Sequence, residues 1–538
     1  TDRPTDRPTD RQDPPTPAWR PTDAASGGPA CMRAAMAATA ATAMVVATIV
    51  AVVARDVAAQ QPGTVVFGEA GFLYPRYRPL AATANAFGGK SQTAGTGQNG
   101  PYRYMQLCAS PIAAKYALVA TGTSAARPGG TLASLLNAAR SSVATEDGLN
   151  GYNKVPAYAH TAGTTPVHVP NACAYTQVSG RALFVSVDTE SFAKYVYEVP
   201  PSPSPPSLSS VAAIGGVNNA FHVRLAAAPT RNDVVAVFAD TQLRNSAYVW
   251  DGDSNSWGPA HQLAADRGDY NSRSALNVAC AAGYSDGVRC TAFTSVTGSN
   301  SLHVKSWLAS SGAWDASLTA VAPPSGVSAQ PYWTYVAVRG ARLCVLVHDK
   351  DDRVWAAVST DGDNRAYVRT LLSTSVASRD RRVADVAFEA LSGNCVAVWA
   401  KNGNGMQYAV YDAASSMWGA AADIAGPNVG GDIDGQTSTR NVLSVQLDAD
   451  PTSDDVMLVG IASGERLNAA RWRASAWTDM GTNGLVQGSL AESTPAGGAF
   501  AYDRYVYVPP TAVPTAAPTA TGATPSPSVA PAMIEPQK

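Results

Sequence analysis

The sequence predicts an all-β protein built as a β-propeller, and three observations lead to that expectation. Short runs of residues alternate between apolar and polar side chains, as in strands with one buried face. Gly, Asp, Asn and Ser residues separate these runs, as in tight turns. A strand–turn–strand unit returns about every 55 residues, a period typical of propeller blades.

The repeat is clearest where two segments are aligned. From Val234 the chain reads VVAVFADTQLRNSAYVWDGDSNSWG, and from Val396 it reads VAVWAKNGNGMQYAVYDAASSMWG. Each segment has an apolar strand, a polar turn, a second strand and a closing Trp, and each follows another alternating run. Four strands per unit are therefore expected. Seven units are marked by one residue each: Leu118, Phe184, Val235, Cys290, Cys344, Cys395 and Met457.

Seven units predict seven four-stranded blades, with eight or six blades as alternatives. No single blade can bury both of its faces, so neighbouring blades must pack around a central axis. The runs Phe500–Val508 and TVVF from Thr64 would close the ring by completing one blade, or would form an eighth. The segment TLASLLNAARSSVA from Thr131 is expected to form a helix in an inserted loop.

The two ends of the chain differ from the repeats in composition. Residues 1–31 are rich in Pro, Thr, Asp and Arg and are expected to be a disordered extension, upstream of the native protein. Residues 32–59 resemble a signal peptide, with an uncharged stretch, Ala34–Ala54, that would alternatively serve as a membrane anchor. Residues 60–508 form the predicted propeller. Residues 509–538 are Pro-, Thr- and Ala-rich and predict an extended stalk or tail.

Cysteine usage agrees with a secreted or cell-surface protein. Cys31 precedes the signal segment, which leaves an even number of cysteines in the mature chain: Cys108, Cys173, Cys280, Cys290, Cys344 and Cys395. An even number in an oxidising compartment favours disulfides. Cys280 and Cys290 lie in facing strands of one hairpin and are the one predicted pair. The alternative is that several of the cysteines are simply buried apolar residues.

Charge and motifs exclude several classes of function. The 39 Lys and Arg residues nearly balance 41 Asp and Glu residues, for a formal charge of −2, so nucleic acid is not an expected partner. A membrane is an expected partner only if the N-terminal apolar segment is retained. No Walker, dinucleotide-binding, GxSxG or HExxH motif occurs, and no cofactor apart from calcium is expected.

The closing turns carry a resemblance to known propellers. They are Ser254–Trp257, Ser310–Trp314, Ser415–Trp418 and Ser475–Trp477, with Ser359–Gly362 as a further partial copy. These turns resemble the Asp-box of sialidase-like propellers and the blade ends of fungal fucose lectins. The resemblance implies a propeller fold and a carbohydrate ligand.

The sequence departs from both families at the residues that act on sugars. Sialidases use an arginine cluster and acidic groups, and no such constellation can be assigned from the sequence. The third strands contain none of the glutamates that fucose lectins use. No repeated pair of carboxylates suits a glycosidase. An enzyme is therefore the weaker hypothesis.

Two groups of residues are candidates for ligand sites. Stacking on sugars is one hypothesis for six tryptophans, and packing between blades is the alternative: they are Trp250, Trp257, Trp314, Trp399, Trp418 and Trp477. Asp251, Asp253 and Asn255 offer oxygen ligands at alternate positions, as calcium loops do. The alternative is that the same residues simply suit a tight hairpin.

The sequence thus predicts a secreted or cell-surface propeller that binds carbohydrate or an extracellular-matrix or cell-wall ligand. One alternative is a glycosidase on the same fold, which acids or an arginine cluster converging in the channel would favour. The other is a structural matrix protein, which the lack of a pocket would favour. Fold alone does not decide between these alternatives.

Overall fold

The computed structural model describes residues 62–67, 76–80, 87, 91–92, 102–122, 131–137, 142–147, 169–187, 192–200, 206–218, 220–240, 244–264, 275–359, 366–377, 379, 381–402, 405–424, 442–462, 466–480 and 498–504. The chain divides into Thr1–Ala58 and Ala59–Lys538, and all described residues belong to the second unit. The predicted N-terminal extension, signal segment and C-terminal stalk lie outside the described residues.

These residues form eight antiparallel sheets, here called blades 1 to 8 in ring order. Blade 1 contains β36 (Gly498–Tyr502), β1 (Gly63–Phe67), β2 (Arg76–Leu80) and β3 (Ser91–Gln92). Blade 2 contains β4 (Tyr102–Ala109), β5 (Tyr116–Gly122), β6 (Thr131–Leu136) and β7 (Ser142–Asp147). Blade 3 contains β8 (Asn171–Tyr175), β9 (Ala182–Ser186), β10 (Phe192–Val199), β11 (Ser207–Leu208) and β12 (Ala212–Asn218). Blade 4 contains β13 (Ala220–Ala227), β14 (Asp233–Asp240), β15 (Asn245–Asp251), β16 (Ser256–Trp257) and β17 (His261–Ala264).

The second half of the ring repeats the same plan. Blade 5 contains β18 (Asn277–Tyr284), β19 (Gly287–Thr294), β20 (Leu302–Leu308), β21 (Ala313–Trp314) and β22 (Thr319–Val321). Blade 6 contains β23 (Pro331–Arg339), β24 (Arg342–Asp349), β25 (Val354–Ser359) and β26 (Tyr367–Ser373). Blade 7 contains β27 (Ala384–Phe388), β28 (Cys395–Ala400), β29 (Met406–Asp412), β30 (Met417–Trp418) and β31 (Ala422–Asp423). Blade 8 contains β32 (Val442–Ala449), β33 (Val456–Ala462), β34 (Arg466–Arg473) and β35 (Ala476–Asp479).

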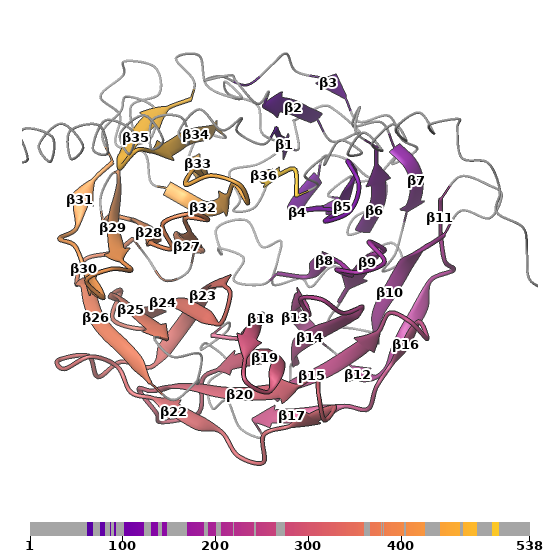
Figure 1. The fold of residues 1–538 in the computed structure, drawn as a ribbon, viewed down its shortest axis with the longest axis horizontal. Helices are drawn as coiled ribbons and strands as arrows, with labels where there is room; N and C mark the ends of the chain where they lie inside the picture. The colour runs from indigo at the N-terminus through magenta and orange to yellow at the C-terminus, as the bar shows by residue number, and fades with distance from the viewer. Residues whose placement is uncertain are drawn as a thin grey trace, which may run out of the picture. The chain divides into compact units, whose positions relative to one another are not determined.

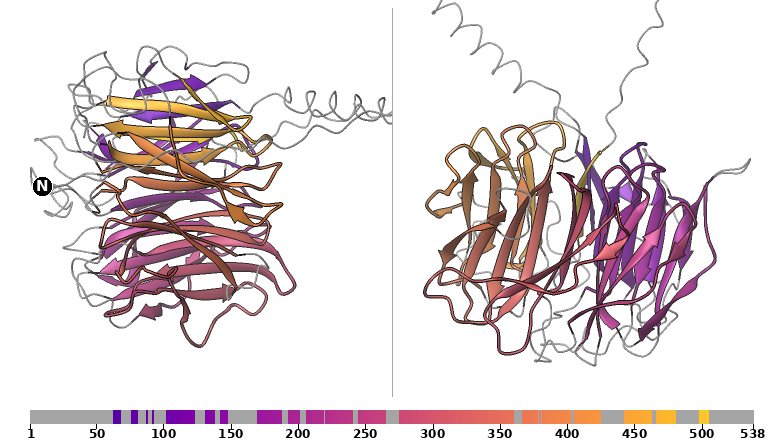
Figure 2. Two further views of the ribbon diagram at one scale, coloured as in Figure 1. Left: turned by 90° about the vertical axis from the view of Figure 1, so that its left-hand side faces the viewer. Right: turned by 60° about the horizontal axis from the view of Figure 1, so that its bottom comes forward.

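The innermost strands form a closed ring around a central channel. Each contacts the next in the order β36, β4, β8, β13, β18, β23, β27, β32 and back to β36. Figure 1 shows this arrangement down the ring axis, with the remaining strands of each blade farther out. In the side views of Figure 2 the strands run across the thickness of the ring. The predicted all-β propeller is confirmed.

The predicted number of seven blades is wrong, because the described residues form eight. The seven marker residues all lie in second strands, from Leu118 in β5 to Met457 in β33, so the repeat correctly locates blades 2 to 8. The additional blade is formed from both ends of the propeller. In it, β36 pairs antiparallel with β1, placing Val65 opposite Phe500.

The helix expected from Thr131 is also wrong. Residues Thr131–Leu136 form strand β6, which lies between β5 and β7 in blade 2. All six side chains are buried, and four of them belong to apolar clusters that involve β5. Leu and Ala are good helix formers, but intrinsic helix propensity is small in energy, and packing between blades overrides it. None of the described residues forms a helix long and apolar enough to cross a membrane.

Apolar second strands explain why the blades pack into a ring. Strand β28 reads CVAVWA and β14 reads DVVAVFAD, and every residue of β28 is buried. Because neighbouring blades cover both faces of these strands, apolar residues at successive positions are all removed from water. Third strands such as β29 carry a more mixed burial pattern, because they lie farther from the axis.

Three disulfides link the strands. They join Cys108 to Cys173, Cys280 to Cys290, and Cys344 to Cys395. The predicted Cys280–Cys290 pair is confirmed and lies within blade 5. The other two join neighbouring blades, from β4 to β8 and from β24 to β28.

Asp503 follows the closing strand and is expected to make stability depend on pH. Its backbone N–H donates to Pro62 O at 2.7 Å, while its Oδ1 is buried with no hydrogen-bond partner among the described residues. Burial raises the pKa of Asp503 to about 6. The folded state therefore holds this proton more tightly than the unfolded chain does, and stability falls as the pH rises from about 4 to about 6.

The Asp503→Asn variant is expected to match the parent near pH 4 and to exceed its unfolding free energy by about 1 kcal/mol at pH 8. The raised pKa alone would give roughly three times that value, but partial exposure screens the charge. Urea unfolding of both proteins across this pH range measures the difference. A gap of equal size at pH 4 and pH 8 would exclude titration of Asp503 as its cause.

Candidate functional site

The central channel contains a cavity of about 290 Å³. Its walls come from the innermost strands and from the residues just before them, so all eight blades contribute to one site. The residues that line it are Tyr104, Met105, Gln106, Leu107, Val169, Arg224, Leu225, Asn277, Val278, Tyr335, Val336, Arg382, Asp385, Ser444, Val445, Gln446, Leu447 and Gly498.

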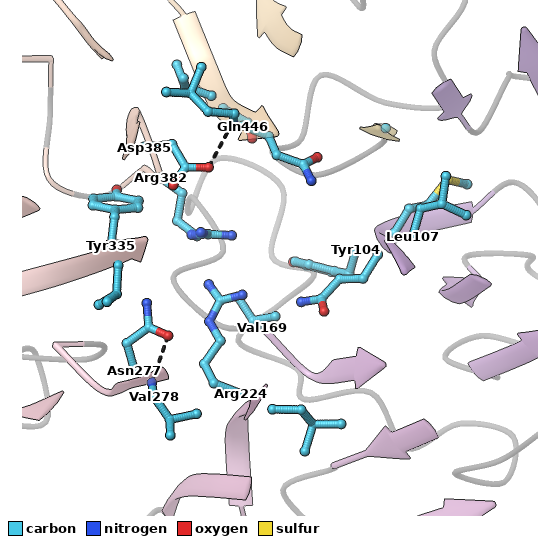
Figure 3. Close-up of a pocket in the computed structure, with 18 residues that line it drawn as sticks. Tyr104, Leu107, Val169, Arg224, Asn277, Val278, Tyr335, Arg382, Asp385 and Gln446 are labelled. Carbon is cyan, nitrogen blue, oxygen red and sulfur yellow. Dashed lines mark hydrogen bonds between the residues drawn. The ribbon is translucent and has the colours of Figure 1, made fainter. Parts of the chain in front are cut away.

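Two arginines that are far apart in the sequence converge in this cavity. Arg224 projects from β13 and Arg382 precedes β27, and Figure 3 shows both guanidinium groups pointing toward the middle of the cavity. Both residues are half-buried, and the Nε atom of each is buried with no hydrogen-bond partner in the described part of the chain. Burial lowers the pKa of Arg224 well below its usual value, and the charge of Arg382 lowers it further.

Asp385 is the one carboxylate among the described residues that line this cavity. Its Oδ1 accepts the backbone N–H of Val386 and its Oδ2 accepts that of Leu447, each at 2.9 Å. Burial raises the pKa of Asp385, while Arg382 opposes that shift. Asp385 therefore connects β27 to β32 and balances part of the positive charge.

Two amide side chains connect other inner strands in the same way. Asn277 Nδ2 donates to Thr334 O at 2.8 Å, from β18 to β23. Gln446 donates to Phe500 O and accepts from Phe500 N, both at 3.3 Å, from β32 to β36. These bonds fix the positions of the strands that carry the lining residues, so the cavity is a preformed site.

Tyr335 packs beside the arginines. The Arg382 guanidinium lies 5.5 Å from the centre of the Tyr335 ring, within the range of a cation–π contact. The Tyr335 hydroxyl is buried. Burial raises the pKa of Tyr335 well above its usual value, so the hydroxyl stays protonated.

A second cavity of about 450 Å³ adjoins the first and shares Val336 and Leu447 with it. Its charged groups already have partners. Asp448 forms an ion pair with Arg504, and Arg339 donates to two backbone carbonyls, Ala390 O and Leu391 O, at 3.0 Å each. The first cavity is therefore the better candidate for a ligand site.

The structure places the six predicted tryptophans in the second, third or fourth strands of their blades, and none of them is among the described residues that line the cavity. Trp250 is 1% exposed and Trp399 is 0% exposed, so both belong to the core. The other four are half-buried, in the turns that close blades 4, 5, 7 and 8: Trp257, Trp314, Trp418 and Trp477.

The four closing turns share one backbone feature. The residue two positions before each Trp has a left-handed φ between 55° and 67°: Asn255, Gly312, Ser416 and Ser475. Each Trp then pairs across the strands with an aromatic residue of the third strand, as in Trp250–Trp257. In blades 4, 5 and 8 a ring from the preceding blade packs on the closing Trp, as Tyr195 does on Trp257. These contacts give the tryptophans a packing role, and sugar stacking by them stays a prediction.

The predicted calcium ligands cap the turn of blade 4. Asp251 Oδ1 accepts the N–H groups of Asp253 and Ser254, and its Oδ2 accepts the Ser254 hydroxyl at 2.7 Å. The hydrogen bond from Ser254 is the main cause of the lowered pKa of Asp251. Asp253 accepts from Asn232, and Asn255 is the left-handed residue. Among the described residues no group of three His, Cys, Asp or Glu side chains could hold a metal ion, and the calcium site stays a prediction.

The arginine pair is what the sequence analysis missed. Arg224 interrupts the apolar inner strand AFHVRLA, and Arg382 is the second residue of the run RRVADVAF. A charged residue at an inward-facing position of an innermost strand is the signal that would have identified Arg224. Their convergence required the arrangement of blades 4 and 7 around the ring.

No protein-family model and no curated protein matches this chain. Similar solved structures include a lectin from Burkholderia pseudomallei, with 11% identity, a TM-score of 0.47 and coverage of 70% of this chain and 99% of that chain. The fucose-recognising six-bladed propeller lectin of Aleuria aurantia has 15% identity and a TM-score of 0.33, covering 59% of this chain and 96% of its own. A protein from Arthrobotrys oligospora has 9% identity and a TM-score of 0.37, with coverage of 75% and 90%.

The eight sheets described above establish the propeller, and the predicted architectural resemblance to lectin-type propellers is confirmed to that extent. At these levels of identity and TM-score, the ligands of those proteins are not transferred to this chain.

Proposed function

We propose that this chain is a secreted carbohydrate-binding protein whose ligand enters the central channel. The observation that carries the proposal is the cavity of about 290 Å³ in which the side chains of Arg224 and Arg382 converge. A pocket with a few converging polar groups and an apolar remainder is typical of small-ligand sites, and its size suits one sugar ring. Guanidinium groups donate to the hydroxyl oxygens that carbohydrates present.

Other features support parts of this proposal. Three disulfides agree with an oxidising compartment, as in secreted proteins. The Pro- and Thr-rich residues 509–538 would then act as a stalk in a matrix or cell wall. A pocket with charged walls is unexpected for a purely structural protein, so binding is the better hypothesis.

A glycoside hydrolase is the second candidate, because an arginine cluster in the channel is the feature expected to favour it. Hydrolysis of glycosides generally uses two carboxyl groups at a set separation. In the described part of the cavity wall there is a single carboxylate, Asp385, and both of its oxygens accept backbone N–H groups. The arrangement therefore fits binding better than hydrolysis.

Blocking the channel tests where the ligand binds. Val336 is half-buried and lines both cavities, so a Val336→Trp variant is expected to fill the space and to abolish binding to a glycan panel. Val178→Trp is the matched control, because Val178 is 55% exposed and lies in the loop between β8 and β9. Circular dichroism and melting confirm that each variant is folded.

Equal binding by Val336→Trp and the parent would place the site elsewhere. The half-buried tryptophans would then be tested next, beginning with Trp418→Ala. Release of sugar from the same glycans over time would favour the hydrolase.

A further inference from the structure

We propose that the channel ligand carries an anionic group, a carboxylate or a sulfate ester, which binds between Arg224 and Arg382. This inference rests on the proposed function and specifies the chemical class of the ligand. It follows from the charges of the cavity, from the hydrogen-bond capacity that the arginines leave unused and from the rigidity of their surroundings.

The described residues of the cavity wall carry an excess of positive charge. Among the described residues that line the cavity, three belong to types that carry a charge at neutral pH: Arg224, Arg382 and Asp385. Two guanidinium groups thus face one carboxylate, which already accepts two backbone hydrogen bonds. Like charges brought together out of water repel each other, so an anion placed between them would relieve this cost.

The geometry of the two groups suits an anion with several oxygens. A guanidinium has five N–H donors in a planar fork and binds carboxylate or sulfate oxygens in pairs. The two groups point toward the same space from blades 4 and 7, and their Nε atoms have no partner among the described residues. A neutral sugar would use the donors but would leave the charges uncompensated.

The surroundings hold the two arginines in position. Arg382 lies against the Tyr335 ring, and the backbone carbonyl of Arg382 accepts the N–H of Val445 at 3.0 Å. Arg224 lies in a strand whose neighbours, Val223 and Leu225, pair with β14. A preorganised pair of donors loses little conformational freedom when the anion binds, which favours selective binding.

Three sugars that differ at one carbon atom test the proposal: glucose, glucuronic acid and glucose 6-sulfate. The full chain is titrated with each, and binding is followed by calorimetry and by the shift of the melting temperature. We expect the charged sugars to bind at least about 10-fold more tightly than glucose, with the preference weakening as salt is added. Whichever charged sugar binds with the higher affinity identifies the carboxylate or the sulfate as the preferred group.

Arginine variants then assign the effect to the pair. Arg224→Gln and Arg382→Gln are each expected to lose at least about 10-fold in affinity for the charged sugars and little for glucose. Arg342→Gln is the matched control, because Arg342 does not line either cavity. Without ligand, Arg224→Gln is expected to melt at or above the temperature of the parent, because the variant removes one of two repelling charges.

The possible results separate this proposal from the general one. Equal affinity for glucose and the charged sugars, lost in Val336→Trp, would overturn the anionic ligand and keep the channel as a carbohydrate site. A charge preference that persists in Val336→Trp or in both arginine variants would place the anion outside the channel and also overturn the inference. A lower melting temperature of ligand-free Arg224→Gln, with unchanged affinity, would assign Arg224 a structural role only.

Discussion

A chain that ends at residue 497 is expected to lose the propeller fold, whereas a chain that ends at Arg504 is expected to keep it. The shorter chain lacks β36, the innermost strand of blade 1, which pairs with β1 over all five of its residues. The side chains of Phe500 and Tyr502 are 1% and 0% exposed. Both belong to one apolar cluster that joins blade 1 to blade 8. Loss of these two rings alone costs about 6–10 kcal/mol. That cost is comparable with the whole stability of a domain, about 5–15 kcal/mol.

Limited proteolysis and near-ultraviolet circular dichroism of the two truncated chains measure the difference. The chain that ends at Arg504 is the control, because it keeps every described residue of blade 1 and the ion pair of Arg504 with Asp448. The full-length Tyr502→Ala variant tests the same contacts by a smaller change, and its unfolding free energy is expected to fall by about 3–5 kcal/mol. Equal protease resistance of the two truncated chains would show that the ring does not depend on β36.

The second large effect concerns the disulfide between blades 6 and 7. Replacing both Cys344 and Cys395 by Ala is expected to lower the unfolding free energy by about 4 kcal/mol, because the bond closes a segment with a sequence separation of 51. Alanine is chosen over serine because both positions are 0% exposed, and a hydroxyl there would be buried. The Cys280–Cys290 bond spans a separation of only 10, so its removal is expected to cost about 2.7 kcal/mol.

Urea unfolding of the two double variants, compared with the parent, measures both values. A common slope with a shifted midpoint would assign the change to stability alone. If removal of the Cys280–Cys290 bond proved the more damaging, loop closure would be excluded as the main source of stabilisation.

The sequence predicts the parts of this fold that depend on local patterns. Marker residues from Leu118 to Met457 identify seven second strands because packing on both faces requires continuous apolar runs. Cys280 and Cys290 could be paired because they lie directly opposite in one hairpin, and the structure gives them that register. The position two residues before each closing Trp has a left-handed φ, and turn-forming residues, Asn, Gly or Ser, occupy it in every case.

Contacts between distant segments could not be predicted in this way. The pairing of Phe500 with Val65 decides between seven and eight blades, and no local pattern distinguishes the two arrangements. The predicted helix from Thr131 is wrong because Leu and Ala favour a helix by local propensity, while the contacts with neighbouring strands and blades that make it a strand are not visible in the sequence. Arg224 and Arg382 come from blades 4 and 7, so their convergence depends on how the whole ring closes.

The position of β36 also sets the order in which the protein can mature during synthesis. Strand β1 emerges from the ribosome first, but its partner begins only at Gly498. At about 5–20 residues per second, the ribosome needs on the order of tens of seconds to make the intervening chain. Throughout that time one edge of β1, with the apolar residues Val65, Val66 and Phe67, has no strand to pair with. Nascent chains would therefore depend on protection of this edge, and slowed translation between blades 1 and 8 would be expected to increase their aggregation.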